Sequence, residues 1–137
     1  AQMDLHDHFV QARKDNFAWL KDRLRSCEEF LILPEPTENS VPSWFGFPIT
    51  LRENAPVSRV DLLNYLDQNK VGTRLLFAGN LTRQPYMIGR NFRISGELAS
   101  TDTIMNSTFW IGVYPGLKTE MLNFMVNKIE SFLGVDF

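Results

Sequence analysis

The sequence predicts a single α+β domain of two layers, in which helices pack on one face of a small sheet. Three observations lead to this fold class. The chain has 137 residues, of which 44% are hydrophobic, and at this length a single core needs no metal or disulfide. Apolar residues recur with helical spacing in some segments and alternate with period two in others. No repeat, low-complexity tract or linker divides the chain.

The composition narrows the possible functions. Fourteen Lys and Arg side chains stand against 16 Asp and Glu, for a net charge of −2, so neither nucleic-acid binding nor attachment to anionic membranes is expected. No apolar run approaches the roughly 18 residues that span a bilayer. No secretory signal precedes the first helix, so a cytoplasmic location is expected. The chain starts at Ala1, which fits a processed protein or a piece of a longer one.

The first segment predicts a long helix followed by a short strand. Residues 5–27 carry an apolar stripe at helical spacing that only Arg13 interrupts, so we expect one amphipathic helix. Residues 30–33 form a brief apolar run that Pro34 and Pro36 end. This run predicts a short strand that leads into an extended loop.

The next element predicts a second strand because side chains alternate across residues 44–51. Pro48 cannot donate to a sheet ladder, so the strand should have an edge or a bulge there. The alternation places four apolar residues on one side of the strand, namely Phe45, Phe47, Ile49 and Leu51.

A helix and a strand follow. Ser58 and Asp61 form a capping box that predicts a helix ending near Lys70. Residues 73–77 predict a strand. Residues 78–93 have no sustained periodicity, and loops of this length are usually functional or mobile.

The last third predicts a short helix, a strand and a longer helix. Residues 96–105 suit the short helix, and residues 108–114 alternate with Trp110 and Tyr114 on the face opposite the apolar one. Gly134 should end the final helix. Its buried stripe should comprise Leu122, Met125, Val126, Ile129 and Leu133.

Most catalytic signals are missing from the chain. His6 and His8 are two residues apart near a helix start, which places them on different faces rather than together on a metal. Cys27 falls on the apolar stripe with no neighbouring histidine, so a small core residue is expected rather than a nucleophile. No glycine-rich phosphate loop of a known kind occurs. We therefore expect no metal site, and no familiar catalytic motif marks this chain.

Residues 73–85 differ from the rest because they gather hydrogen-bond donors around a glycine turn. Arg74, Asn80 and Arg83 offer groups suited to phosphate or sugar oxygens, and an arginine fork suits anions in particular. The alternative is that both arginines pair at the surface with glutamates such as Glu35, Glu38 or Glu97.

Aromatic residues cluster on both faces of two predicted strands, so one set must meet a second layer or form an interface. An exposed aromatic face of this kind also predicts self-association at high concentration. The cluster comprises Trp44, Phe45, Phe47, Trp110 and Tyr114.

Three runs make the sequence recognisable: PSWFGFPIT at 42–50, VGTRLLFAGNLTRQP at 71–85 and IMNSTFWIGVYPGL at 104–117. They resemble the C-terminal part of the CDP-4-keto-6-deoxyglucose 3-dehydrases, which belong to the nucleotide-sugar aminotransferase family of fold-type I vitamin B6 enzymes. The resemblance covers nearly the whole chain. It implies that residues 1–137 are a single C-terminal small domain of the aminotransferase type, with a connecting helix at 1–28, an α+β core at 29–137 and the catalytic large domain absent.

The resemblance also implies a chemistry for the full-length protein. Such dehydrases use pyridoxamine 5'-phosphate, which condenses with a 4-keto sugar so that a histidine base can act and the C3 hydroxyl leaves. An iron-sulfur flavoprotein reductase then supplies electrons, which leads to 3,6-dideoxyhexoses of lipopolysaccharide O-antigen. The family further implies a homodimer.

The resemblance implies roles for four residues. Phe45 would lie near the cofactor or the sugar, whereas Arg74, Asn80 and Arg83 would meet nucleotide phosphate or sugar hydroxyls. The alternative for Phe45 is core packing. The chain's five lysines fall on predicted helices or their ends without a cofactor motif, so the essential base should lie elsewhere and this chain alone should be inactive.

Two alternatives remain open at this stage. The same domain could come from a sugar aminotransferase that uses pyridoxal phosphate and glutamate, although residues 79–85 favour the dehydrases. The residue that decides between them lies upstream. The other alternative is a free-standing, non-catalytic module that binds a protein or a sugar nucleotide through its aromatic face.

Overall fold

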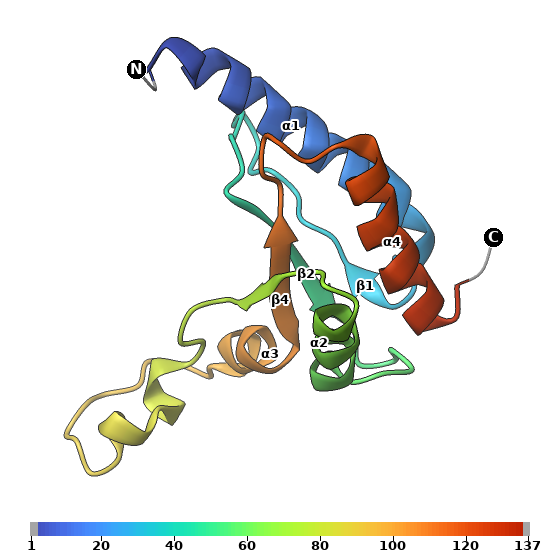
Figure 1. Cartoon of the computed structure of the whole chain (residues 1–137). Coiled ribbons are helices and arrows are strands. Elements are labelled where there is room, and N and C mark those ends of the chain that lie inside the picture. The colour runs from blue at the N-terminus through green and yellow to red at the C-terminus, as the bar shows by residue number, and fades with distance from the viewer. Residues whose placement is uncertain (1–2, 136–137) are drawn as a thin grey trace.

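The structure is a computed structural model in which residues 3–135 are described, and it is a four-stranded antiparallel sheet with packed helices (Figure 1). Short 3-10 turns occur at Met3–Leu5, Leu24–Cys27, Leu81–Arg83 and Pro85–Met87. The main elements are α1 (His6–Arg23), β1 (Leu31–Ile32), β2 (Gly46–Leu51), α2 (Arg59–Gln68), β3 (Thr73–Leu75), α3 (Ala99–Ser107), β4 (Thr108–Gly112) and α4 (Thr119–Leu133).

The strand order is β1-β2-β4-β3, so β2 and β4 form the centre of the sheet. The short strand β1 pairs only with the last two residues of β2, Thr50 and Leu51. Pro48 therefore has a sheet neighbour on one side alone, where it faces Trp110 of β4. The edge expected at this proline is confirmed.

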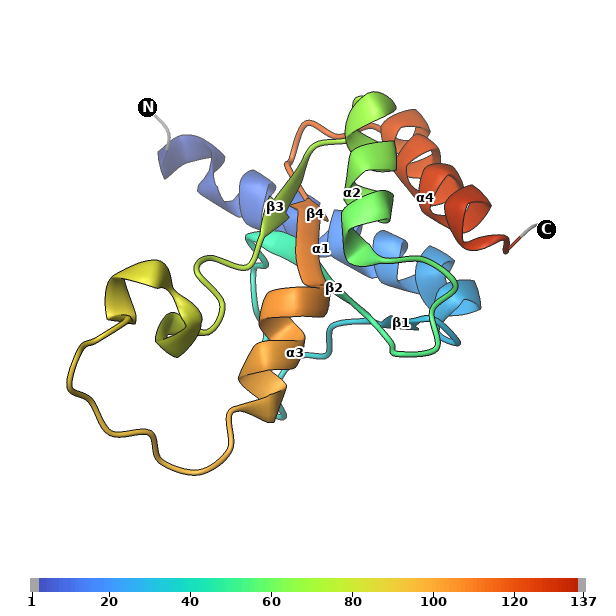
Figure 2. The ribbon, with the colours of Figure 1, turned by 90° about the horizontal axis from the view of Figure 1, so that it is seen from below.

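The core lies on one face of the sheet. The inward side chains of β2 and β4 are fully buried, including Phe47, Ile49, Phe109 and Ile111. Figures 1 and 2 show α1, α2 and α4 gathered on this side. Complete burial of each such side chain contributes about 1.5–3 kcal/mol. The α+β class with helices on one face is as the sequence predicts.

Local signals begin and end the helices as expected. The Ser58 hydroxyl oxygen accepts a hydrogen bond from the backbone N–H of Asp61 at 3.1 Å, which caps α2. At the other end of the chain, Gly134 takes a left-handed φ of 72° and ends α4. Cys27 is fully buried, and burial raises the pKa of its thiol, so it is a core residue.

Two predicted boundaries are wrong for a backbone reason. The strand expected to reach residue 77 ends at Leu75, because Phe77 takes a left-handed φ of 49° that no strand continues. The helix expected from residue 96 begins at Ala99, since Gly96 has a φ of 73° and lies in the preceding loop.

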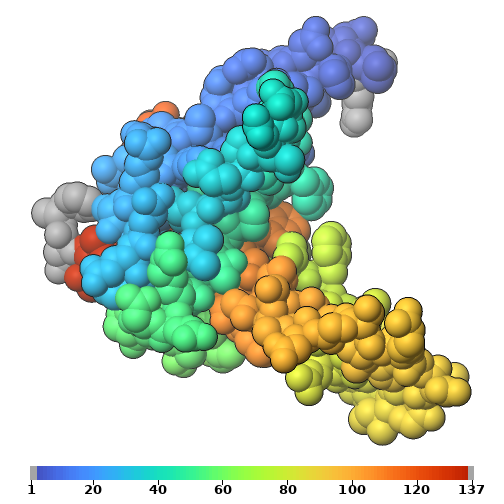
Figure 3. Space-filling view, turned by 180° about the vertical axis from the view of Figure 1, so that it is seen from behind, coloured from blue at the N-terminus to red at the C-terminus, as the bar shows by residue number. Residues whose placement is uncertain are grey.

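Between β3 and α3, residues 78–98 form an arm that projects from the body (Figures 1 and 2). Figure 3 shows the arm and the N-terminal part of α1 as two separate protrusions. Gly79 allows the base of the arm to pack closely against α3, because a Cβ at this position would lie 2.4 Å from Cγ of Met105. No helix among the described residues is both long and apolar enough to cross a membrane.

Candidate functional site

The sheet has a second face, opposite the core, that the helices leave uncovered. Pro48, Trp110 and Arg74 lie in one row across β2, β4 and β3, since Trp110 is in register with both of the others. Residues directly opposite each other in an antiparallel sheet share a face. We call the surface formed by Phe45, Pro48, Arg74, Leu76, Phe77 and Trp110 the outer face.

The outer face holds a shallow hollow of about 220 Å³ lined almost entirely by apolar side chains. Phe45 is 73% exposed and Phe77 is 90% exposed. Exposed apolar surface of this density marks a contact site for a ligand or another protein surface. A phenylalanine at a positive φ also carries backbone strain, which is found mainly at functional positions.

Gly46 is required where the hollow meets the sheet. A Cβ at this position would lie 2.2 Å from Cε3 of Trp110, so only glycine leaves room for the indole. The ring of Phe45 then packs on Trp110, with 5.1 Å between centroids and 58° between the planes. This arrangement is a favourable tilted aromatic pair.

The sequence placed Phe45 on the same side as Phe47, and this prediction is wrong. Trp44 and Phe45 precede the first β2–β4 pair, Gly46 with Gly112, so the strand alternation does not govern them. Trp44 turns instead to α1 and stacks on Phe17 with 4.4 Å between centroids. Phe45 is left on the outer face rather than in the core.

Arg74 belongs to the outer face through its register with Trp110. Among the described residues, its Nη1 donates only to the carbonyl oxygen of Thr73, its own neighbour, at 3.0 Å. In the part of the chain that the structure describes, no carboxylate pairs with Arg74. The ion pair considered as the alternative is therefore absent from residues 3–135, and the guanidinium is available to an anion.

Asn80 and Arg83 lie elsewhere, at the base of the arm. Arg83 donates from Nη2 and Nε to the two carboxylate oxygens of Asp102 at 2.7 and 3.3 Å. Asn80 is 1% exposed, donates to Asp102 at 2.6 Å and accepts from the hydroxyl of Thr82 at 2.7 Å. This network, not any glutamate named from the sequence, is the partner of Arg83.

The network shifts two pKa values. Hydrogen bonds from Arg83, and then from Asn80, hold the pKa of Asp102 below its usual value. The same contact raises the pKa of Arg83. Sequence reasoning missed Asp102, and the available signal was an acidic residue in the first turn of a helix next to a loop rich in donors.

The four residues named from the sequence thus fall into two groups. Phe45 and Arg74 lie on the outer face, whereas Asn80 and Arg83 anchor the arm to α3. The outer-face pair is open to a ligand. The other pair is already engaged, although the Arg83 side chain remains 62% exposed.

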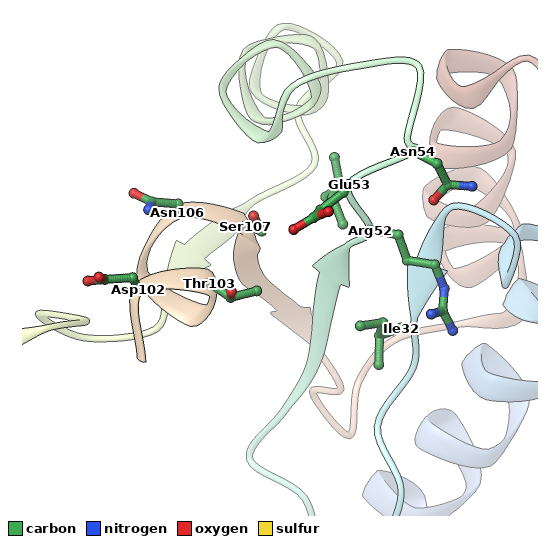
Figure 4. A pocket seen from close by; sticks show the side chains of 9 residues that line it. Ile32, Arg52, Glu53, Asn54, Asp102, Thr103, Asn106 and Ser107 are labelled. Carbon is green, nitrogen blue, oxygen red and sulfur yellow. The ribbon is translucent and has the colours of Figure 1, made fainter. Parts of the chain in front are cut away.

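A larger hollow of about 630 Å³ lies between α3 and the end of β2 (Figure 4). Two of its polar side chains, Arg52 and Asn54, point away from it and donate to the carbonyls of Glu28 and Glu29 at 2.9 and 3.2 Å. Asp102 points toward the arm. No cluster that could hold a metal occurs within residues 3–135. The outer face is therefore the better candidate site.

Residues 1–130 match the sequence profile of the DegT/DnrJ/EryC1/StrS aminotransferase family. The chain belongs to this family. It is 59% identical over all 137 residues to the lipopolysaccharide biosynthesis protein RfbH of Salmonella typhimurium, of which it spans 31%. It is 39% identical over 134 residues to a dTDP-4-dehydro-2,6-dideoxy-D-glucose 3-dehydratase of Saccharopolyspora spinosa, of which it spans 29%.

Solved structures of a 3-dehydratase and of an aminotransferase share the fold. The GDP-4-keto-6-deoxy-D-mannose-3-dehydratase of E. coli with bound hydrated PLP matches 93% of the chain with a TM-score of 0.81 and 16% identity, over 32% of its own length. An aminotransferase from Psychrobacter cryohalolentis matches 97% with a TM-score of 0.84 and 15% identity, over 36% of its length. The chain spans about a third of the length of the relatives and solved structures that it matches.

Proposed function

We propose that the chain is the C-terminal small domain of a nucleotide-sugar 3-dehydrase that acts on CDP-4-keto-6-deoxyglucose. In this proposal residues 1–28 connect to a large domain and residues 29–137 form the small-domain core. The observation that carries the proposal is the 59% identity to the lipopolysaccharide biosynthesis protein RfbH over the whole chain. The product would enter the synthesis of 3,6-dideoxyhexoses for O-antigen in the cytoplasm.

The dehydrase branch is favoured over the aminotransferase branch by the curated relatives. The relative at 39% identity is named a 3-dehydratase, and so is a third relative, from Yersinia pseudotuberculosis, at 26% identity. The fold does not discriminate, because aminotransferases match the chain equally well.

The residues present fit one wall of a site for pyridoxamine or pyridoxal phosphate. The outer face offers an open apolar hollow beside Arg74, which has no carboxylate partner among the described residues. In this proposal Phe45 packs on the cofactor or the sugar, and Arg74 binds a phosphate or a sugar oxygen. The cofactor, when bound, supplies an electron sink that stabilises negative charge on the neighbouring carbon.

Arg83 and Asn80 enter the proposal in a more restricted way. The free edge of the Arg83 guanidinium could meet a phosphate while its other edge stays on Asp102. Asn80 acts mainly by fixing the arm, because its amide is buried against Asp102 and Thr82. In the full-length enzyme, Arg83→Ala should raise KM for the nucleotide sugar if Arg83 binds substrate, and lower stability at unchanged kinetics if it is only an anchor.

The base that moves the proton would come from the large domain. Of the lysines, Lys21 pairs with Glu35 at 2.5 Å, and none of the five lines the hollow of the outer face. We therefore expect the 137-residue chain alone to be inactive. Detectable dehydration of a 4-keto sugar by this chain would contradict the proposal.

The decisive experiment uses the full-length protein, pyridoxamine 5'-phosphate and CDP-4-keto-6-deoxyglucose in ¹⁸O-water. Reversible loss of the C3 hydroxyl incorporates ¹⁸O at C3 without any reductase. The C4 carbonyl oxygen also exchanges with water, so after removal of the enzyme the sugar is returned to unlabelled water, and the ¹⁸O that mass spectrometry still detects is at C3. The GDP- and dTDP-linked 4-keto sugars serve as comparison substrates. If ¹⁸O enters C3 of the GDP- or dTDP-linked sugar but not of the CDP-linked sugar, the CDP assignment is overturned. The assignment as a dehydrase then still stands.

The aminotransferase alternative predicts a different product. With pyridoxal phosphate and glutamate it would yield a 4-amino sugar and no ¹⁸O at C3. A non-catalytic binding module would give neither product but would still bind the sugar nucleotide or a protein through the outer face. The dehydrase proposal also includes a homodimer and a separate iron-sulfur flavoprotein reductase as electron donor.

A further inference from the structure

Arg13 occupies a position where the apolar stripe of α1 faces the sheet, and a charged side chain is costly there unless it has partners. The side chain is half-buried. Its Nη1 donates to the carbonyl oxygens of Trp44 at 3.3 Å and Phe45 at 3.2 Å. Both residues precede the first β2–β4 pair, so Arg13 holds a segment that the ladder does not hold.

The same guanidinium contacts the ring of Phe45. Its Cζ lies 5.9 Å from the ring centroid, within the range of a cation–π attraction. The other neighbour of the ring is Trp110 at 5.1 Å. Because Phe45 is 73% exposed, core packing does not fix its direction, and these two contacts do.

Asn16 reinforces this arrangement one turn further along α1. Its side chain is buried, and Nδ2 donates to the carbonyl oxygen of Tyr114 at 2.9 Å. Tyr114 follows the end of β4, which lies beside the start of β2. Arg13 and Asn16 of α1 therefore both bind the same end of the β2–β4 pair. The hydrogen bond of Asn16 fixes the position of α1 along the strands, and with it the position of Arg13.

We propose that Arg13 is a positioning residue that holds the Phe45 ring where the substrate or cofactor meets the outer face. The inference rests on the proposed function, because it takes Phe45 to be a contact residue. A lysine could reach one carbonyl but would lack the planar fork that bridges two, so Arg13→Lys should restore the function only in part.

A double-mutant cycle in the full-length enzyme tests the proposal. Phe45→Ala should raise KM for the nucleotide sugar about tenfold, and Arg13→Ala about fivefold, with kcat within about twofold of wild type. The double variant should be no worse than Phe45→Ala alone, because Arg13 acts through Phe45. Arg25→Ala is the matched control, since Arg25 pairs with the exposed Asp22 at 3.9 Å, and it should leave KM unchanged.

A second measurement does not depend on activity. Hydrogen exchange of the amides between Pro42 and Pro48 should be faster in Arg13→Ala than in wild type or Arg25→Ala. If Arg13→Ala does not fold, Arg13→Lys takes its place in the cycle, with a KM rise of about twofold that disappears in the Phe45→Ala background.

The outcomes separate the two levels of inference. Additive effects of Arg13→Ala and Phe45→Ala, or unchanged KM in Arg13→Ala with a raised KM in Phe45→Ala, would overturn the positioning role and leave the proposed function intact. Unchanged KM in Phe45→Ala would overturn the contact role of Phe45 and the positioning role with it. Absence of C3 exchange in the wild-type enzyme would overturn the proposed function itself.

Discussion

At the scale of single residues, Gly46 gives the sharpest prediction. In Gly46→Ala the new Cβ would overlap Cε3 of Trp110 at 2.2 Å, so the indole or the strand must shift. We expect a loss of about 1–3 kcal/mol in the free energy of unfolding. Gly112→Ala on the facing strand is the matched control, because no atom lies within 4 Å of its Cβ. Equal denaturant midpoints for the two variants would show that the indole does not need this space.

A second residue-scale prediction concerns Asp102. Asp102→Ala should leave the buried amide of Asn80 without its acceptor and loosen the arm, so that trypsin cleaves faster at Arg90 and Arg93. Glu97→Ala, an exposed acid just before α3, is the control. Cleavage of both variants at the wild-type rate would mean that Asp102 does not anchor the arm.

The same carboxylate should make stability depend on pH. The folded pKa of Asp102 lies below its unfolded value of about 3.9, so its contribution is present above that value. It is lost as the pH falls through the folded pKa. The Tm of Asp102→Ala should therefore lie below that of wild type at neutral pH, and the two should converge in acid. A constant difference down to the lowest pH would contradict this linkage.

Some residues were predictable from the sequence and others were not. Burial of Phe47 and Cys27 followed from periodicity, since each lies inside a regular element. Phe45 did not follow, because one residue beyond the ladder the backbone is free to turn its side chain to the other face. The contact of Asp102 with Arg83 joins residues 19 apart across an irregular arm, and local patterns do not encode such a pair.

At the scale of elements, the cap of α2 can be tested directly. Ser58→Ala removes the oxygen that accepts from the N–H of Asp61, and it should lower the stability by about 1 kcal/mol. Ser95→Ala in the exposed arm should have no effect. A thermal or urea unfolding series distinguishes the two. Similar midpoints for Ser58→Ala and wild type would mean that water replaces the cap without cost.

Elements with strong local signals were predictable. The capping box of α2, the apolar stripe of α4 and the alternation in β4 each fix an element whatever its neighbours do. Boundaries set by a positive φ at a non-glycine residue were not predictable, as Phe77 shows. The projection of the arm follows from how β3 and α3 are placed in space, which is a tertiary property.

At the scale of the whole molecule, the outer face and the arm leave large apolar side chains without cover. Phe45, Phe77 and Ile88 are 73%, 90% and 82% exposed. In the proposed full-length enzyme another part of the protein or the substrate would cover the outer face. Within residues 3–135 no part of the 137-residue chain covers the outer face. The outer face of a second copy can therefore bind to it in solution.

We therefore expect the chain to associate with itself as its concentration rises, which sedimentation velocity detects as an increasing weight-average mass. Phe77→Ser should weaken this association, because it removes the most exposed aromatic ring of the outer face. Val41→Ser is the control, since Val41 is 81% exposed but lies in the loop before β2 and does not line the hollow of the outer face. A strict monomer at all concentrations would show that exposure of the outer face does not suffice for association. Equal weakening by both substitutions would instead mean that copies meet through general apolar contact rather than through the outer face.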